Sequence, residues 1–167
     1  EDLRGSAEAP IWLGGLPGGA RPRLVGGGNA IHLVRAAWLV VHDLEVSGQS
    51  ANGLNVDDGG AVTQPGAAGP LIFRHLSIHD VGSSGNQDCL KLSGIEDVLV
   101  RDASFSRCGG GGSGSAIDMV GVHRALVARC SFADLSGNAL QAKGGSTDVE
   151  LRWSRLERAG ERGVNMG

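Results

Sequence analysis

The chain repeats one short pattern of apolar residues along most of its length. An apolar or small residue begins each of five copies, at Leu39, Leu71, Val98, Ala125 and Val149. An apolar residue stands again seven positions later in every copy, at Val46, Ile78, Phe105, Phe132 and Leu156. Charged or small residues lie between these positions. Short segments that alternate in this way are typical of β-strands.

Each copy continues with a stretch rich in Gly, Asn and Ser, and then with a short triplet that alternates about a polar centre. The central residues of six triplets are His32, Asn55, Lys91, Asp118, Gln141 and Asn165. Successive centres lie 23, 36, 27, 23 and 24 residues apart. No segment shows the 3.6-residue period of an amphipathic helix. A repeat of roughly this length with three short strands is typical of one coil of a parallel β-helix.

The repeat therefore predicts an all-β fold, a right-handed parallel β-helix (a solenoid) of about six coils of about 23 residues. We expect one domain over residues 1–167. The 29 glycines would serve the turns between strands, and the aromatic content of 4% suits a narrow core of stacked aliphatic side chains. Leucine-rich repeats have a similar period, but their Leu-x-x-Leu-x-Leu pattern is not followed.

Both ends of the sequence are expected to be uncapped. No amphipathic helix precedes Ile11-Trp12-Leu13, and Gly167 directly follows a triplet. Because an uncapped coil exposes its core, we expect a fragment of a longer β-helix protein, or end-to-end packing with another chain. No signal peptide or membrane span is present in this sequence. The net charge of −3 gives no indication of nucleic-acid binding.

Three insertions flank the triplets of the middle coils and mark one face of the predicted solenoid. They are Asp57 to Pro70, Val81 to Asp88 and Gly109 to Ser115. Beside the central column, a second column precedes the triplets at Asn29, Asn52, Asp88, Ser115, Asn138 and Arg162. A third follows them at Asp57, Ser93, Val120 and Lys143. Loops on a rigid scaffold often carry function, so this face is the predicted groove.

Stacking of the coils would bring four charged residues of this face within roughly 5–10 Å of one another. They are Asp88, Lys91, Asp118 and Lys143. Such a cluster suits a polar polymer. The alternative is a set of cross-strand ion pairs with a structural role alone. Asn52 and Asn138 are expected to be turn or ladder asparagines.

One further segment is a candidate for metal ligation. Asp57-Asp58-Gly59-Gly60 offers oxygen ligands to a metal, and Ca²⁺ is the one cofactor that the sequence suggests. The alternative for this segment is a solvated turn. The histidines outside the triplets are expected on the surface, at His42, His75, His79 and His123.

The three cysteines lack the spacing of a metal site. Cys130 falls in an inward column and is expected to be a small core residue. A disulfide from Cys108 to a neighbouring coil is one option. The odd count leaves one thiol over.

The coil pattern resembles the pectin-lyase-like superfamily of right-handed parallel β-helices. The segment Asn86-Gln87-Asp88-Cys89-Leu90-Lys91-Leu92-Ser93-Gly94 is similar to a polygalacturonase-type motif, with Asp88 at its second aspartate and Gln87 in place of its first. The neighbouring coils lack the histidine and the other aspartate of that set, whereas inverting hydrolysis needs two carboxyl groups. Lys143-Gly144-Gly145-Ser146 is similar to the Lys-Ser-Ser stretch of β-helix alginate and chondroitin lyases.

The resemblance implies a carbohydrate-active protein of bacterial type, secreted, periplasmic or on the cell surface, that acts on or binds an acidic polysaccharide or another glycan. An enzyme of this kind would be a polysaccharide lyase acting by β-elimination, in preference to a glycoside hydrolase. Lys143 or Lys91 would be the base, and Arg162 would bind the uronate carboxylate. Asp88 and Asp118 would orient these groups or hold a metal. Substrate-binding residues on the same face would be His32, Asn55, Gln141 and Asn165.

The alternative is a protein without catalysis. A surface adhesin, a spike or a structural β-helix module would need the rigid face and none of the catalytic sets. The incomplete match to those sets favours this alternative.

Overall fold

The computed structural model of the chain describes residues 2–16, 18–61, 66–82, 84–110 and 114–167. Parts of the three predicted insertions, residues 62–65, 83 and 111–113, lie outside the described residues. The described residues form strands and turns and no α-helix. The strands are β1 (Ile11–Gly14), β2 (Arg23–Val25), β3 (Ile31–Val34), β4 (Leu39–His42), β5 (Glu45–Ser47), β6 (Leu54–Asp57), β7 (Leu71–Arg74), β8 (Ser77–Val81), β9 (Leu90–Ser93), β10 (Glu96–Arg101), β11 (Ser104–Cys108), β12 (Ser115–Val120), β13 (His123–Ala128), β14 (Ser131–Leu135), β15 (Asn138–Lys143), β16 (Thr147–Arg152), β17 (Arg155–Ala159) and β18 (Val164–Met166).

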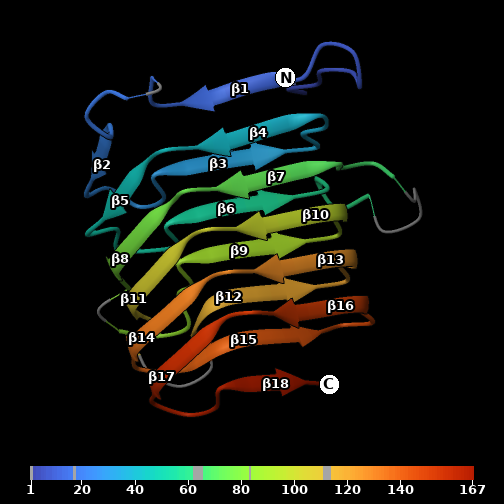
Figure 1. Cartoon of the computed structure of the whole chain (residues 1–167). Helices are drawn as coiled ribbons and strands as arrows, with labels where there is room; N and C mark the ends of the chain where they lie inside the picture. Colours follow the sequence, from blue (N-terminus) through green and yellow to red (C-terminus); the bar gives the residue numbers. More distant parts are fainter. Residues whose placement is uncertain (1, 17, 62–65, 83, 111–113) are drawn as a thin grey trace.

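The strands follow one another in a fixed cycle through three parallel, six-stranded sheets. The first sheet has the order β1-β4-β7-β10-β13-β16, the second β2-β5-β8-β11-β14-β17 and the third β3-β6-β9-β12-β15-β18. Figure 1 shows the resulting stack of coils, with the two chain ends at opposite ends of the stack. The chain makes about five full turns between β1 and β16. The predicted all-β parallel solenoid is confirmed, with about five turns in place of about six coils.

The register of the third sheet follows the triplets of the sequence. His32 pairs with Asn55, Asn55 with Lys91, and Lys91 with Asp118. Gln141 and Asn165 continue the same column. The uneven spacings of the triplets leave this register intact, because the extra residues lie in loops between strands.

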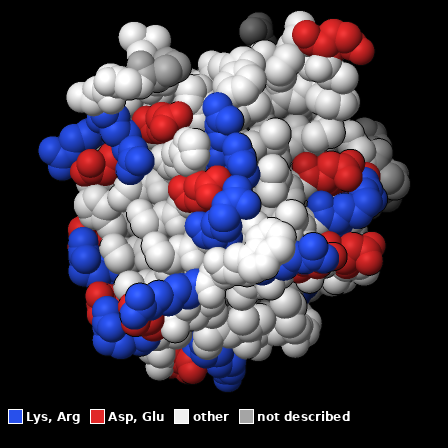
Figure 2. All heavy atoms as spheres, in the orientation of Figure 1, with Lys and Arg blue, Asp and Glu red and all other residues white. Residues whose placement is uncertain are grey.

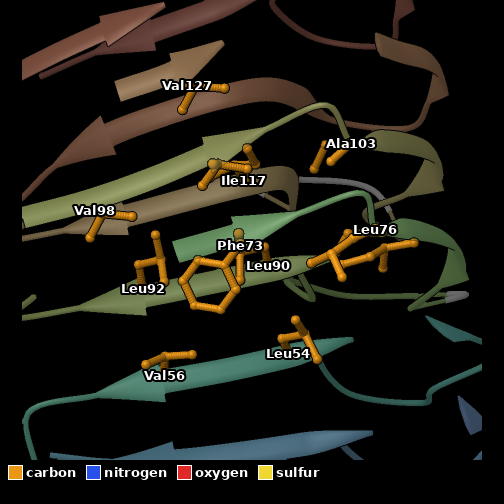
Figure 3. Packing of buried hydrophobic residues seen from close by; sticks show 14 of the residues in the cluster. Leu54, Val56, Phe73, Leu76, Leu90, Leu92, Val98, Ala103, Ile117 and Val127 are labelled. Atoms are coloured by element: carbon orange, nitrogen blue, oxygen red, sulfur yellow. The ribbon is translucent and has the colours of Figure 1, made fainter. Parts of the chain in front are cut away.

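The core consists of columns of apolar side chains that point inward from all three sheets. Val46, Ile78, Phe105 and Phe132 stack on successive coils of the second sheet and are almost fully buried. The rings of Phe105 and Phe132 lie parallel, with centroids 5.2 Å apart. Figure 3 shows the same inward packing for side chains of the first and third sheets. Burial of these columns supplies the main stabilisation of the stacked coils.

Residues with left-handed backbone, most of them charged, turn two corners of the solenoid. After the first sheet this column is Asp43, His75, Asp102, Arg129 and Trp153, with φ of 50 to 52°. At the end of the second sheet it is Asp80, Arg107, Asp134 and Arg158. Opposite charges pair between coils, as in Arg129 Nε with Asp102 Oδ1 at 2.7 Å. Figure 2 shows blue and red side chains side by side in small groups on the side of the molecule seen in Figure 1. These columns could not be predicted from the sequence, because a surface charge carries no sign of its backbone conformation.

The described residues include no helix of the length and apolarity that a membrane crossing requires.

Candidate functional site

The outward face of the third sheet carries the charged cluster that the sequence predicts. Strands β9, β12 and β15 are neighbours and place Lys91, Asp118 and Gln141 in one column. Lys143 lies two residues beyond Gln141 on the same face, in register with Val120. The residues between point into the core, because side chains alternate along a strand.

Asp118 lies between the two lysines and is fully buried. Its Oδ2 accepts a hydrogen bond from Lys91 Nζ, and its Oδ1 is 3.1 Å from Lys143 Nζ. Lys143 Nζ also donates to Gln141 Oε1 at 3.0 Å. The lysine side chains keep 20% and 31% of their surface exposed, whereas Asp118 keeps none. A buried carboxylate without partners would be costly, so Asp118 holds both ammonium groups at this place.

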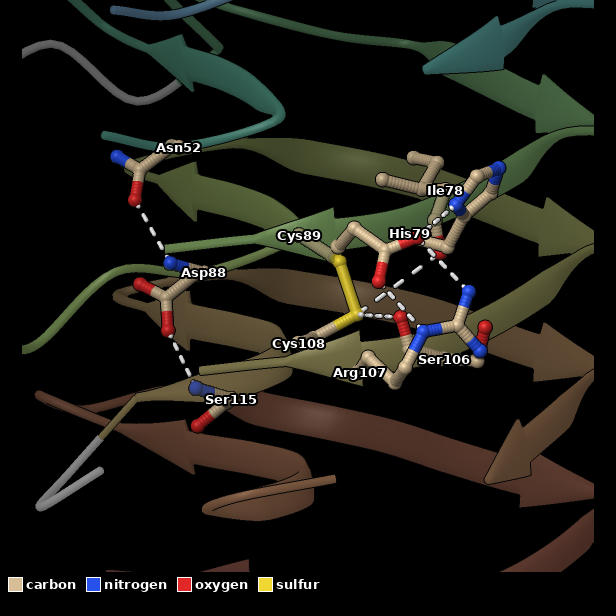
Figure 4. The surroundings of a disulfide bond; sticks show 10 residues. Asn52, Ile78, His79, Asp88, Cys89, Ser106, Arg107, Cys108 and Ser115 are labelled. Carbon is tan, nitrogen blue, oxygen red and sulfur yellow. Dashed lines mark hydrogen bonds and ion pairs between the residues drawn. A yellow bond between two sulfur atoms is a disulfide. The ribbon is translucent and has the colours of Figure 1, made fainter. Parts of the chain in front are cut away.

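Asp88 belongs to a ladder of side-chain oxygens that joins successive coils. Asn29 Oδ1 accepts from the backbone N–H of Asn52 at 2.9 Å, and Asn52 Oδ1 accepts from that of Asp88 at 2.8 Å. Asp88 Oδ1 then accepts from the backbone N–H of Ser115 at 2.7 Å. Figure 4 shows the last two of these bonds. The structure thus confirms Asn52 as a ladder asparagine and places a carboxylate at the next step.

The surroundings of Asp88 favour its protonated form. Its side chain is 2% exposed, and its Oδ2 is 3.7 Å from Lys91 Nζ. Burial, followed by the negative charge of Asp118, raises the pKa of Asp88 to about 7. A carboxyl group that changes its protonation near neutral pH is a candidate for general acid–base chemistry.

A disulfide fixes the backbone beside Asp88. Cys89, the next residue, is bonded to Cys108 at the end of β11. Figure 4 shows this bond directly beside the ladder. The option of a Cys108 disulfide to a neighbouring coil is confirmed. Cys130 is the remaining thiol and is buried in its predicted inward column.

The predicted residues of the early coils form a second polar group. His32 Nε2 lies 2.7 Å from Asp57 Oδ2, and Asn55 Nδ2 donates to the same oxygen at 3.2 Å. Asn52 Nδ2 donates to Asn55 Oδ1 at 3.1 Å. These contacts join the group to the ladder and hence to Asp88.

Two predicted site residues lie on the last coil, and of these Arg162 is away from the cluster. Arg162 is exposed, and its carbonyl accepts from the N–H of Ala139. Its column reaches Asp88 only through the coils of Asn138 and Ser115, at ~4.8 Å a step. Asn165 pairs with Gln141. The structure therefore does not place Arg162 beside the ammonium groups of Lys91 and Lys143, although all three residues were expected to act on the same uronate.

The predicted calcium ligands are engaged in their own turn. Asp57 Oδ1 accepts from the N–H of Gly59 at 2.9 Å, and Asp58 Oδ1 accepts from that of Gly60 at 2.8 Å. Within the described ranges, no three His, Cys, Asp or Glu side chains gather to hold a metal ion. The Ca²⁺ site stays a prediction from sequence, without a ligand set in the structure.

A pocket of about 370 Å³ adjoins the cluster at the end of the third sheet. Its lining comprises Asp58, Ala61, Gly66, Ser93, Gly94, Glu96, Val120, Gly121, His123 and Gly144. His123 and Glu96 pair across β13 and β10. The pocket was not predicted from the sequence, which indicated only a surface position for His123. The signal available in the sequence was that Glu96 and His123 occupy the same position of the repeat. The sequence did not indicate that Asp58 and Ala61 line a pocket with them.

The comparisons with known proteins give the chain no family. No protein-family model and no curated protein matches it. Among solved structures it is similar to an alginate lyase from Paenibacillus sp., with 15% identity and a TM-score of 0.35. That alignment covers 98% of this chain and 86% of the lyase chain. A similarity at this level carries no argument about activity.

Proposed function

We propose that the outward face of the third sheet binds an acidic polysaccharide, with Lys91 and Lys143 recognising a uronate carboxylate. The observation that carries this proposal is the buried Asp118 between two ammonium groups that reach solvent. Side chains held in place before binding lose less conformational entropy when the ligand arrives. The two lysines flank the Asp118 carboxylate, so these groups keep one positive charge for an anionic ligand while the neighbouring Asp88 is protonated.

The second candidate is a polysaccharide lyase. β-Elimination needs a base for the C5 proton and a positive group beside the uronate carboxylate. Lys91 and Lys143 supply positive charge, and Asp88 is a carboxyl group with a pKa of about 7 beside Lys91. Against direct catalysis, Asp88 and Asp118 are almost completely buried. A ligand on this face would meet the ammonium groups first, which favours binding as the primary function.

The fold and the disulfide support two broader proposals. We propose that the chain belongs to the pectin-lyase-like superfamily, and its parallel solenoid and coil pattern support this. The Cys89–Cys108 disulfide is compatible with an extracellular protein, because such bonds persist in oxidising compartments. Secretion or display at the cell surface would bring the face into contact with polysaccharides.

The binding proposal is tested by titrating the protein with polyuronates and with an uncharged polysaccharide in a calorimeter. Lys91→Ala and Lys143→Ala should each weaken polyuronate binding by at least about tenfold, as loss of a charged contact does. Arg158→Ala is the matched control, since it removes a positive charge at a distant corner. It should change affinity by less than about twofold. Wild-type binding that neither lysine variant weakens would overturn the proposal.

The lyase candidate is tested with the same polymers by ultraviolet absorbance of the unsaturated product, with and without Ca²⁺. Formation of that product, lost in Asp88→Asn, would establish catalysis. Binding without product would leave a non-catalytic module.

A further inference from the structure

The pocket beside the cluster continues the same outward face. Ser93 lies two residues beyond Lys91 on β9, and Val120 lies two residues beyond Asp118 on β12. Both Ser93 and Val120 line the pocket. Two residues along a strand span ~7 Å. The pocket therefore begins ~7 Å along the strands from the backbone of Lys91 and Asp118, and directly beside the backbone of Lys143, which is in register with Val120.

The charge of the pocket is opposite to that of the cluster. Its described lining contains the carboxylates of Asp58 and Glu96, with His123, and no Lys or Arg. Glu96 Oε2 accepts from Arg124 at 2.6 Å, and Arg124 is shared with Asp97. Asp58 is 9% exposed, and no ion pair accompanies it within the described part of the chain. A second uronate carboxylate in this pocket would meet like charge.

Backbone without side chains shapes the floor of the pocket. Gly94, Gly121 and Gly144 lie one above another on successive coils, and all three line it. A Cβ at Gly94 would lie 2.2 Å from Asp58 Oδ2, so the absence of a side chain there makes room for the Asp58 carboxylate. The pocket volume of about 370 Å³ falls at the lower end of the range for small-ligand sites.

From these three observations we infer that the pocket is the subsite for an uncharged sugar ring next to the uronate bound by Lys91 and Lys143. The inference rests on the proposed function and names its substrate class: a polysaccharide in which uronate and uncharged sugars alternate. Hydroxyl groups of the uncharged ring would donate hydrogen bonds to Asp58 and Glu96. A polymer of uronate alone would place a carboxylate against them.

The test compares two oligosaccharides of equal length by calorimetry, one of uronate alone and one that alternates uronate with an uncharged sugar. Wild type should bind the alternating oligosaccharide about tenfold more tightly. Asp58→Asn should reduce that preference to less than about threefold by strengthening binding of the uronate oligosaccharide. Asp134→Asn is the matched control, because Asp134 has the same charge, pairs with Arg158 and is not part of the pocket lining. It should keep the full preference.

The outcomes separate this inference from the function on which it rests. Equal binding of the two oligosaccharides by wild type, with Lys91→Ala still disrupting both, would overturn the subsite and leave the acidic-polysaccharide site in place. A preference that Asp58→Asn leaves unchanged would also overturn the subsite and leave the acidic-polysaccharide site in place. Failure of wild type to bind either oligosaccharide would overturn both proposals.

Discussion

The ammonium group of Lys143 lies 3.1 Å from Oδ1 of Asp118, a carboxylate with no exposed surface. The two residues belong to neighbouring coils, and Lys91 occupies the other oxygen of Asp118 from the coil on the opposite side. The stacking of three coils thus creates one buried anion with two positive partners. The consequences of this arrangement for stability and binding can be measured.

Asp118→Asn should destabilise the fold and weaken polyuronate binding together. The amide keeps the shape of the side chain but leaves Lys91 and Lys143 without their shared negative partner. Because the lysines can still reach water, we expect a loss of about 1–3 kcal/mol in the free energy of unfolding. Urea denaturation measures this change. Asp134→Asn, which breaks an exposed pair with Arg158, should cost less than about 1 kcal/mol. Equal effects of the two variants would contradict the structural role given to Asp118.

The stability of the protein should fall as pH rises through the range in which Asp88 titrates. The folded state raises the pKa of Asp88 from 3.8 to about 7, mainly by burial. The folded protein therefore keeps this proton where the unfolded chain has lost it. The stabilisation that this proton gives to the folded state is a few kcal/mol. It is fully present below about pH 4 and is lost as pH rises through about 7.

Asp88→Asn should remove that part of the pH dependence, since an amide oxygen can accept from Ser115 as the carboxylate does. Urea denaturation at several pH values between about 4 and about 8 would show the difference. Asp134→Asn serves as the control, because pairing with Arg158 lowers the pKa of Asp134 and keeps its titration below this window. A wild-type slope that survives in Asp88→Asn would exclude Asp88 as its source.

Gly94→Ala should be more destabilising than Gly121→Ala. Both glycines have left-handed backbone, with φ of 66° and 60°, so each alanine brings a strain of about 1–2 kcal/mol. Only at Gly94 would the new Cβ also collide with the carboxylate of Asp58. At Gly121 the nearest atom is the carbonyl oxygen of Gly144, at 3.5 Å. We expect at least about 1 kcal/mol between the variants by thermal denaturation. Equal stabilities would show that Asp58 does not occupy this space.

Removal of the Cys89–Cys108 disulfide should cost about 3 kcal/mol, as expected for a loop of this size. The two cysteines are 19 residues apart in the sequence. Urea denaturation of Cys108→Ala against Cys130→Ala would measure this, with a smaller cost of about 1 kcal/mol expected for the core thiol.

Thiol titration provides an independent check of the same pairing. Burial raises the pKa of Cys130 to about 11 and shields it, so the folded protein should not react. Denaturation should expose one thiol, and reduction should expose all three cysteines. Three reactive thiols without reduction would contradict the disulfide.

Repetition made much of the fold predictable from sequence. A column such as Val46, Ile78 and Phe105 repeats because every coil presents the same inward position, so register could be inferred without coordinates. The same logic placed Lys91 next to Asp118. The repeat also gave the column to which Arg162 belongs. It did not reveal that the coils of Asn138 and Ser115 separate Arg162 from Asp88.

The sequence by itself determined the strands, their order and the residues that share a face, because these depend on local alternation and on one repeated spacing. Only the tertiary structure decided the burial of Asp118, the partner of Cys108 and the pocket beneath Asp58. Those features depend on how unequal loops pack against the regular coils. Side-chain environments such as the one that raises the pKa of Asp88 arise from atoms of several coils at once.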